Sequence, residues 1–170
     1  PPGAEGLVVL PYWNSALNPY WDADARGVIL GWRGIHTQAH VFRAMLEGIA
    51  FEQRLHTEGV EKALGDEIDT YIVMGGGSQS DLWCQIIADV TGRSVIRSAT
   101  SETASLGVAM LAAVEAGFYR DLVAASDAMS RTMGELFVPD AERGKVYERL
   151  YREVYLPMYP ALKGLMGRIE

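Results

Sequence analysis

Hydrophobic residues occur along the chain either in short continuous runs or at helical spacing. The short runs predict β-strands over 6–11, 26–32, 71–74 and 94–97. Apolar side chains that recur every three or four residues predict helices over 37–59, 81–91, 103–116, 122–132 and 140–162. The first two strands follow each other without a helix, so we expect them to pair antiparallel. The pattern predicts one layered α/β domain over residues 1–170, with a mixed sheet flanked by helices.

The same spacing predicts which side chains of the first and last helices point toward the core and which are solvated. In the first helix the apolar residues form an inward stripe, whereas Glu47 and Arg54 fall on the opposite, solvated face. In the last helix Tyr147 and Tyr151 are expected to point inward. Pro160 predicts a kink or fraying near the end of that helix.

Three consecutive glycines lie between the third strand and the helix that follows it. Gly75, Gly76 and Gly77 remove every Cβ at this turn, so backbone N–H groups could approach a phosphate at the positive end of the helix dipole. Ser78 and Asp81, three residues apart, resemble a capping box at the start of the helix.

Two better-defined phosphate motifs are excluded at this turn. No Gly-Lys-Ser/Thr follows, as a P-loop requires, and Ser80 occupies the position of the third glycine in the dinucleotide fingerprint. A turn that only needs positive φ angles is an alternative interpretation of the glycines.

The loop between the fourth strand and the helix predicted over 103–116 contains four hydroxyl residues between 98 and 103. We expect Ser101 or Thr100 to cap the helix that follows. This helix is rich in small residues, and Gly107 within it predicts close backbone approach to a neighbouring element. The strand over 94–97 is short and is expected near the edge of the sheet.

Composition excludes several classes of protein. Hydrophobic residues make up 49% and charged residues 22% of the 170 residues, as in globular domains. A net charge of −7 disfavours a nucleic-acid or anionic-membrane partner, and no apolar run approaches 18 residues. Cys84 is the only cysteine, which favours a reducing compartment and a cytoplasmic location. The three histidines show no metal-binding pattern.

Several segments together resemble one enzyme family, the C-terminal domain of the FGGY carbohydrate kinases. The segment Pro19-Tyr-Trp-Asp-Ala-Asp-Ala-Arg-Gly27 is similar to a family segment, and the spacing from Gly27 to Ala50 follows a family signature. The stretch 75–92, Gly-Gly-Gly-Ser-Gln-Ser-Asp-Leu-Trp-Cys-Gln-Ile-Ile-Ala-Asp-Val-Thr-Gly, and the loop and helix from Glu102 also fit. The matches span most of residues 6–118.

The resemblance implies a ribonuclease H-like (actin-like ATPase) fold and ATP-dependent phosphorylation of a sugar hydroxyl, with Mg²⁺ bridging the phosphates. It implies that Gly75 to Gly77 pass close to the phosphates and ribose of ATP and that Ser80 lies toward the adenine. The candidate nucleotide-binding residues are therefore Gly75, Gly76, Gly77, Ser78 and Ser80.

The resemblance also implies that part of the enzyme lies outside this sequence. The catalytic Asp and most sugar contacts of the family belong to an N-terminal domain, so no catalytic residue is assigned here. The opening Pro-Pro-Gly-Ala-Glu-Gly, without Met, predicts a piece of a longer protein. The expected partners are ATP, a sugar and that N-terminal domain, with a homodimer possible. The segment at Pro19 and the glycine segment resemble the xylulose kinases of the family more than its glycerol kinases. This resemblance implies a pentulose acceptor such as xylulose.

Two alternative functions stay open at the level of sequence. One is a domain that binds a different adenosine cofactor, S-adenosylmethionine or NAD, at the glycine turn. The other is a non-catalytic interaction domain that uses the helix of Gly107 as a dimer face.

Overall fold

A computed structural model describes residues 1–169, and within them the side chains outside 132–134. Its strands are β1 (Val8–Leu10), β2 (Val28–Leu30), β3 (Thr70–Val73), β4 (Ser94–Ser98) and β5 (Thr132–Phe137). Its helices are α1 (Gln38–Leu64), α2 (Asp81–Thr91), α3 (Thr103–Glu115), α4 (Leu122–Met129), α5 (Ala141–Leu150) and α6 (Leu156–Met166). Two 3₁₀ turns, η1 (Ala4–Gly6) and η2 (Gly76–Gln79), and a π-helical turn, η3 (Tyr151–Tyr155), complete the elements.

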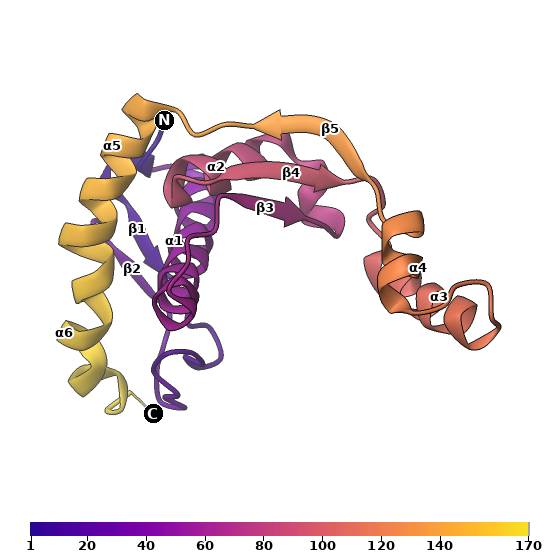
Figure 1. Cartoon of the computed structure of the whole chain (residues 1–170). Coiled ribbons are helices and arrows are strands. Elements are labelled where there is room, and N and C mark those ends of the chain that lie inside the picture. Colours follow the sequence, from indigo (N-terminus) through magenta and orange to yellow (C-terminus); the bar gives the residue numbers. More distant parts are fainter. Residues whose placement is uncertain (170) are drawn as a thin grey trace.

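The molecule has the form of an arch (Figure 1). One side contains the β1–β2 pair, α1 and the continuous helix α5–η3–α6, and α3 and α4 lie at the opposite end. The three-stranded sheet of β3, β4 and β5 connects the two sides above the opening. Within the described residues, none of the helices combines the length and the apolar character that a membrane span requires.

The first sheet confirms the predicted antiparallel pair. Val9 of β1 lies opposite Ile29 of β2. All three residues of β1 are buried, because α1 packs against this strand. Gly48 of α1 is required for this packing, since a Cβ at that position would lie 2.4 Å from the carbonyl oxygen of Val9.

The second sheet is mixed, as predicted, but its order differs from the expectation. β3 and β4 run parallel, with Ile72 opposite Ile96, and β4 and β5 run antiparallel. The strand β4, expected near an edge, is therefore central, because β5 pairs with it. The sequence did not predict β5. The apolar run of β3 is typical of a buried strand, but β3 lies at the edge of the sheet and leaves Ile72 56% exposed.

The long helix α1 extends to Leu64, five residues beyond the predicted end, and stops at Gly65 with φ of 73°. Glu47 is buried, which contradicts its predicted place on a solvated face. The reason is that α1 is covered on more than one side: the residues of η1 and β1 contact it, and Tyr147 of α5 reaches Glu47.

The predicted C-terminal helix is confirmed as one helical segment, α5–η3–α6, but it continues through Pro160 to Met166, four residues beyond the predicted end. The Asp140 carboxylate caps it by accepting hydrogen bonds from the N–H groups of Glu142 and Arg143. Tyr147, Tyr151 and Tyr155 are buried around Phe51 of α1 and form the centre of the main core. The two inward tyrosines predicted from spacing are therefore confirmed.

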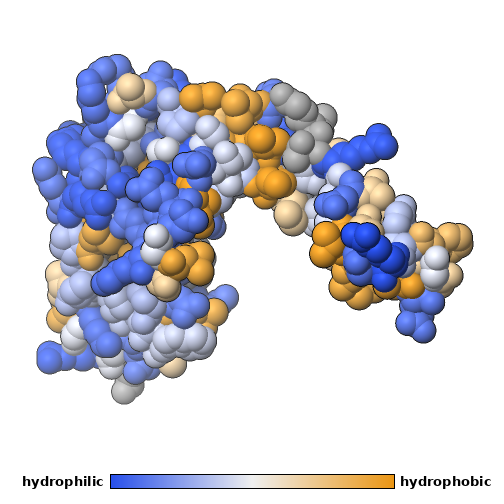
Figure 2. Space-filling model, in the orientation of Figure 1, coloured by the Kyte–Doolittle hydropathy of each residue, from blue (hydrophilic) through white to orange (hydrophobic). Residues whose placement is uncertain are grey.

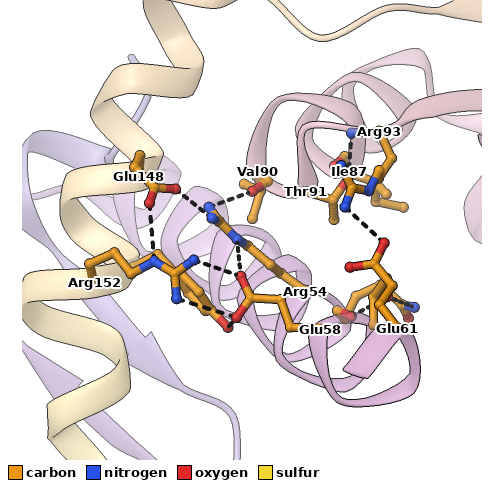
Figure 3. A network of polar contacts seen from close by, with 12 residues as sticks. Arg54, Glu58, Glu61, Ile87, Val90, Thr91, Arg93, Glu148 and Arg152 are labelled. Atoms are coloured by element: carbon orange, nitrogen blue, oxygen red, sulfur yellow. Dashed lines mark hydrogen bonds and ion pairs between the residues drawn. The ribbon is translucent and has the colours of Figure 1, made fainter. Parts of the chain in front are cut away.

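A network of ion pairs joins this C-terminal segment to α1 and α2 (Figure 3). Arg54 of α1 contacts Glu58 at 3.0 Å, Glu148 of α5, and the carbonyl oxygen of Val90 on α2 at 3.2 Å. Arg152 contacts the same two carboxylates at 3.1 and 3.0 Å. Three helices that are distant in sequence are thus held together at one surface cleft.

The α3–α4 pair differs from the rest of the fold because it buries little. No residue of α3 is buried, and in α4 only Ala125 is. The close approach predicted at Gly107 is wrong, since a Cβ there would meet no atom within 4 Å. The predicted caps are wrong as well: Glu102 occupies the N-cap position of α3 without a side-chain hydrogen bond, while the Thr100 hydroxyl accepts from the N–H of Glu102.

Candidate functional site

The glycine turn connects the end of β3 to α2 through a conformation that requires glycine. Gly75 has φ of 81° and ψ of 179°, a region essentially closed to residues with a Cβ. Ser78 stabilises the turn from inside: its hydroxyl donates to the Gly75 carbonyl at 2.7 Å. Cys84 is buried, and its thiol donates to the carbonyl of Ser78 at 3.3 Å.

The N-terminus of α2 is capped by Ser80 rather than by the predicted Ser78–Asp81 pair. The Ser80 hydroxyl accepts a hydrogen bond from the N–H of Trp83 at 3.3 Å. Ser78 is unavailable because its hydroxyl is turned toward Gly75, and Asp81 instead pairs with Arg97 of β4 at 2.7 Å. The cap of this helix therefore lies two residues later than expected.

The exposed part of the turn presents backbone N–H groups. As the first residues of η2, Gly76 and Gly77 have N–H groups with no acceptor inside the turn. Both are exposed, and a Cβ at Gly76 would meet no atom within 4 Å, so space is open beside it. Together with the positive end of the α2 dipole, this surface is suited to an anionic group such as a phosphate.

A groove of about 520 Å³ lies beside the turn, between the sheet and the α3–α4 pair. Its lining comprises apolar side chains, hydroxyls and one arginine: Ile72, Met74, Leu106, Met110, Ser98, Thr103, Ser126, Ser130 and Arg131, with Gly107. Figure 2 shows hydrophobic residues on both sides of the concave face. The groove is at the carboxyl ends of the parallel strands β3 and β4, where ligands bind in open α/β sheets.

The structure separates the predicted site residues into two groups. Gly76, Gly77 and Ser80 are exposed, and the turn begins directly after Met74, which lines the groove. Ser78 is buried and Gly75 determines the conformation of the turn, so these two support the site from within. Arg97 and Arg131 were not predicted as site residues, because no sequence motif marks them. On the far side of the groove, the sequence had marked the hydroxyl-rich loop after β4 and Gly107 of α3.

The residues present fit an adenine nucleotide better than they fit a metal ion. The open space at Gly76, the N–H groups and the apolar groove match a phosphate chain joined to a flat base. Among residues 1–169, no three His, Cys, Asp or Glu side chains are grouped to hold a metal ion. We therefore assign no Mg²⁺ ligand in this chain.

A family model described as "FGGY family of carbohydrate kinases, C-terminal domain" matches residues 1–116. The chain belongs to this family. It is 33% identical to a xylulose kinase of Bacillus subtilis over 167 residues, which cover 97% of the chain and 32% of that protein. It is 35% identical to a ribulokinase of Geobacillus thermodenitrificans over 174 residues, covering 99% of the chain and 30% of that protein.

Solved structures of FGGY kinases share the fold. A xylulose kinase from Rhodospirillum rubrum is 34% identical, with a TM-score of 0.78, over 98% of the chain and 32% of the neighbour. A glycerol kinase of Plasmodium falciparum solved with ADP has a TM-score of 0.74 over 91% of the chain and 31% of the neighbour. The predicted ribonuclease H-like (actin-like ATPase) fold is confirmed. The chain spans about a third of the length of these relatives.

Proposed function

We propose that the chain is the ATP-binding part of a carbohydrate kinase that transfers the γ-phosphate of ATP to a sugar hydroxyl. The observation that carries the proposal is the glycine turn beside an open groove at the carboxyl ends of β3 and β4, in a chain of the FGGY C-terminal domain family. Family membership favours the kinase over an S-adenosylmethionine or NAD domain and over a non-catalytic interaction domain.

Each part of the site has a role in this proposal. The N–H groups of Gly76 and Gly77 and the N-terminus of α2 bind and orient the phosphates, and the apolar lining of the groove takes the base. Bound ATP supplies the phosphoryl group, and catalysis of this kind depends on positioning and charge stabilisation. We propose that Mg²⁺ accompanies ATP and that the residue that deprotonates the sugar lies outside these 170 residues, in an N-terminal domain.

A ketopentose is the acceptor we propose. The xylulose kinase and ribulokinase relatives align with 97% and 99% of the chain, whereas a glycerol kinase of Saccharolobus solfataricus, although 40% identical, aligns with 71%. The test is ADP release by the complete kinase with D-xylulose, D-ribulose or glycerol. We expect either ketopentose to be the better substrate, and faster turnover of glycerol would contradict this choice. The homodimer stays a prediction.

Nucleotide binding at the turn is tested with Gly76→Val in the complete kinase. The space at Gly76 lets the chain fold with a valine, whose side chain then occupies the space needed by the phosphates. We expect ATP affinity, measured by calorimetry, to fall by about tenfold or more, which is about 1.4 kcal/mol. Gly59→Val on the exposed surface of α1, also open around its Cβ, is the matched control and should bind ATP normally. Equal affinities in both variants would refute the site.

A further inference from the structure

Arg97, near the end of β4, is a buried arginine between two exposed carboxylates. Its side chain is 8% exposed, whereas those of Asp81 and Glu135 are 73% and 49% exposed. The guanidinium donates to Asp81 Oδ1 at 2.7 Å and to Glu135 Oε2 at 2.8 Å. Hydrogen bonding to Asp81 raises the pKa of Arg97 further, so the side chain stays charged.

The guanidinium also contacts Cys84 of α2, which is hydrogen-bonded to the glycine turn. Arg97 Nη2 lies 3.8 Å from the Cys84 sulfur, and the Cys84 thiol donates to the Ser78 carbonyl at 3.3 Å. The Ser78 hydroxyl in turn donates to Gly75 at 2.7 Å. A continuous series of hydrogen bonds therefore leads from β4 through α2 to the turn that holds the candidate phosphate-binding N–H groups.

The charge of Arg97 matters because of where Asp81 lies. Asp81 is the first residue of α2, directly after the turn, so its carboxylate shares the helix end that attracts phosphates. An unpaired carboxylate there would repel a phosphate, and Glu135 would add a second negative charge beside it. Two carboxylates and one guanidinium leave one net negative charge, and without Arg97 there would be two.

We propose that Arg97 is a positioning residue for the phosphate end of the nucleotide site, which it keeps accessible by pairing with Asp81 and Glu135. The inference rests on the proposed function. This positioning role can be distinguished from a purely structural role of Arg97 in the sheet. Repulsion by unpaired carboxylates grows with the number of phosphates on the ligand. A structural defect would weaken adenosine and ATP alike.

The experiment is calorimetry of the complete kinase with adenosine, ADP and ATP. We expect Arg97→Met to weaken ATP binding by about tenfold or more, ADP less, and adenosine within about twofold. Arg97→Lys keeps the charge and should lose less affinity for ATP. Arg97→Met with Asp81→Asn should recover much of the loss, and high ionic strength should reduce it because salt screens the repulsion.

Asp81→Asn in the otherwise unaltered protein tests the inference even if Arg97→Met does not fold. It removes a repelling charge and should bind ATP as tightly as the unaltered protein or more tightly, with unchanged affinity for adenosine. Weaker ATP binding in Asp81→Asn, or equal losses for adenosine and ATP in the Arg97 variants, would overturn the inference. If the unaltered kinase binds no nucleotide, the proposed function fails, and the inference with it.

Discussion

At the scale of single residues, the predicted and observed exposure differ most for Glu47, which is buried although its spacing predicts a solvated face. It is 3% exposed, and its Oε1 accepts hydrogen bonds from the Gly3 N–H at 3.0 Å and from Arg43 and Tyr147 at 2.8 Å each. Burial and the Glu47 carboxylate raise the pKa of Tyr147, so the phenol stays protonated and remains a donor. This carboxylate therefore holds the first residues of the chain, α1 and α5 together.

Glu47→Ala should destabilise the fold by about 3 kcal/mol, because it leaves a partly buried guanidinium and a buried phenol without their carboxylate partner. Urea unfolding monitored by circular dichroism measures this as a lower midpoint. Glu115→Ala, at the exposed end of α3, is the control and should change stability by less than about 0.5 kcal/mol. Similar midpoints for the two variants would mean that the buried contacts of Glu47 contribute little.

At the scale of elements, the network of Figure 3 is what joins the three helices at their surface. Arg54 and Glu58, one helical turn apart, lie on one face of α1, but the Arg54 side chain is only 14% exposed and not solvated as predicted. Their partners Glu148 and Arg152 are about ninety residues further along the chain. The burial of Glu148 acts to raise its pKa, but hydrogen bonds from Arg54 and Arg152 outweigh burial and hold the pKa below its usual 4.5.

This lowered pKa predicts a loss of stability in acid. The unfolded chain takes up the proton at a higher pH than the folded chain, so the contribution of Glu148 is fully present above about pH 5 and is lost as the pH falls through the lowered pKa of the folded state. Urea unfolding over that range measures the effect. Glu148→Gln should give a shallower decline than the unaltered protein, and parallel declines would show that Glu148 does not contribute.

At the scale of the whole molecule, the two sides of the arch differ in how firmly they are packed. The side with α1 and the C-terminal helix contains the main core, including Phe51 and the three tyrosines of α5 and η3. The α3–α4 pair buries one residue and leaves Val108, Leu111 and Phe118 largely exposed. Few buried contacts mean that this pair opens at a lower free energy than the core.

Hydrogen exchange measured by mass spectrometry should therefore show faster exchange in α3 and α4 than in α1 and α2, by about tenfold or more. Because both helices line the candidate groove, ATP should slow their exchange while leaving α6 unchanged. Equal exchange in all four helices without ligand would contradict the difference in packing. Protection by ATP confined to other elements would contradict the placement of the base in the groove.

The sequence by itself determined the features that depend on neighbouring residues. The alternation of apolar runs located β1 to β4 and the helices, three glycines located the turn, and spacing placed Tyr147 and Tyr151 inward. These features are local, because backbone freedom and side-chain direction within an element follow from residues a few positions apart. The family segments were also recognisable from sequence, and they lie within the stretch that matches the family model.

Only the tertiary structure decided which surfaces are covered. Glu47 is buried because a second element packs over its face of α1, and β4 is central because β5 pairs with it. Gly107 faces open space because α3 projects from the sheet, and Arg97 of β4 pairs with Asp81 at the start of α2. Burial, strand order and charge pairing depend on contacts between residues far apart in the chain, which the spacing of residues within one element does not record.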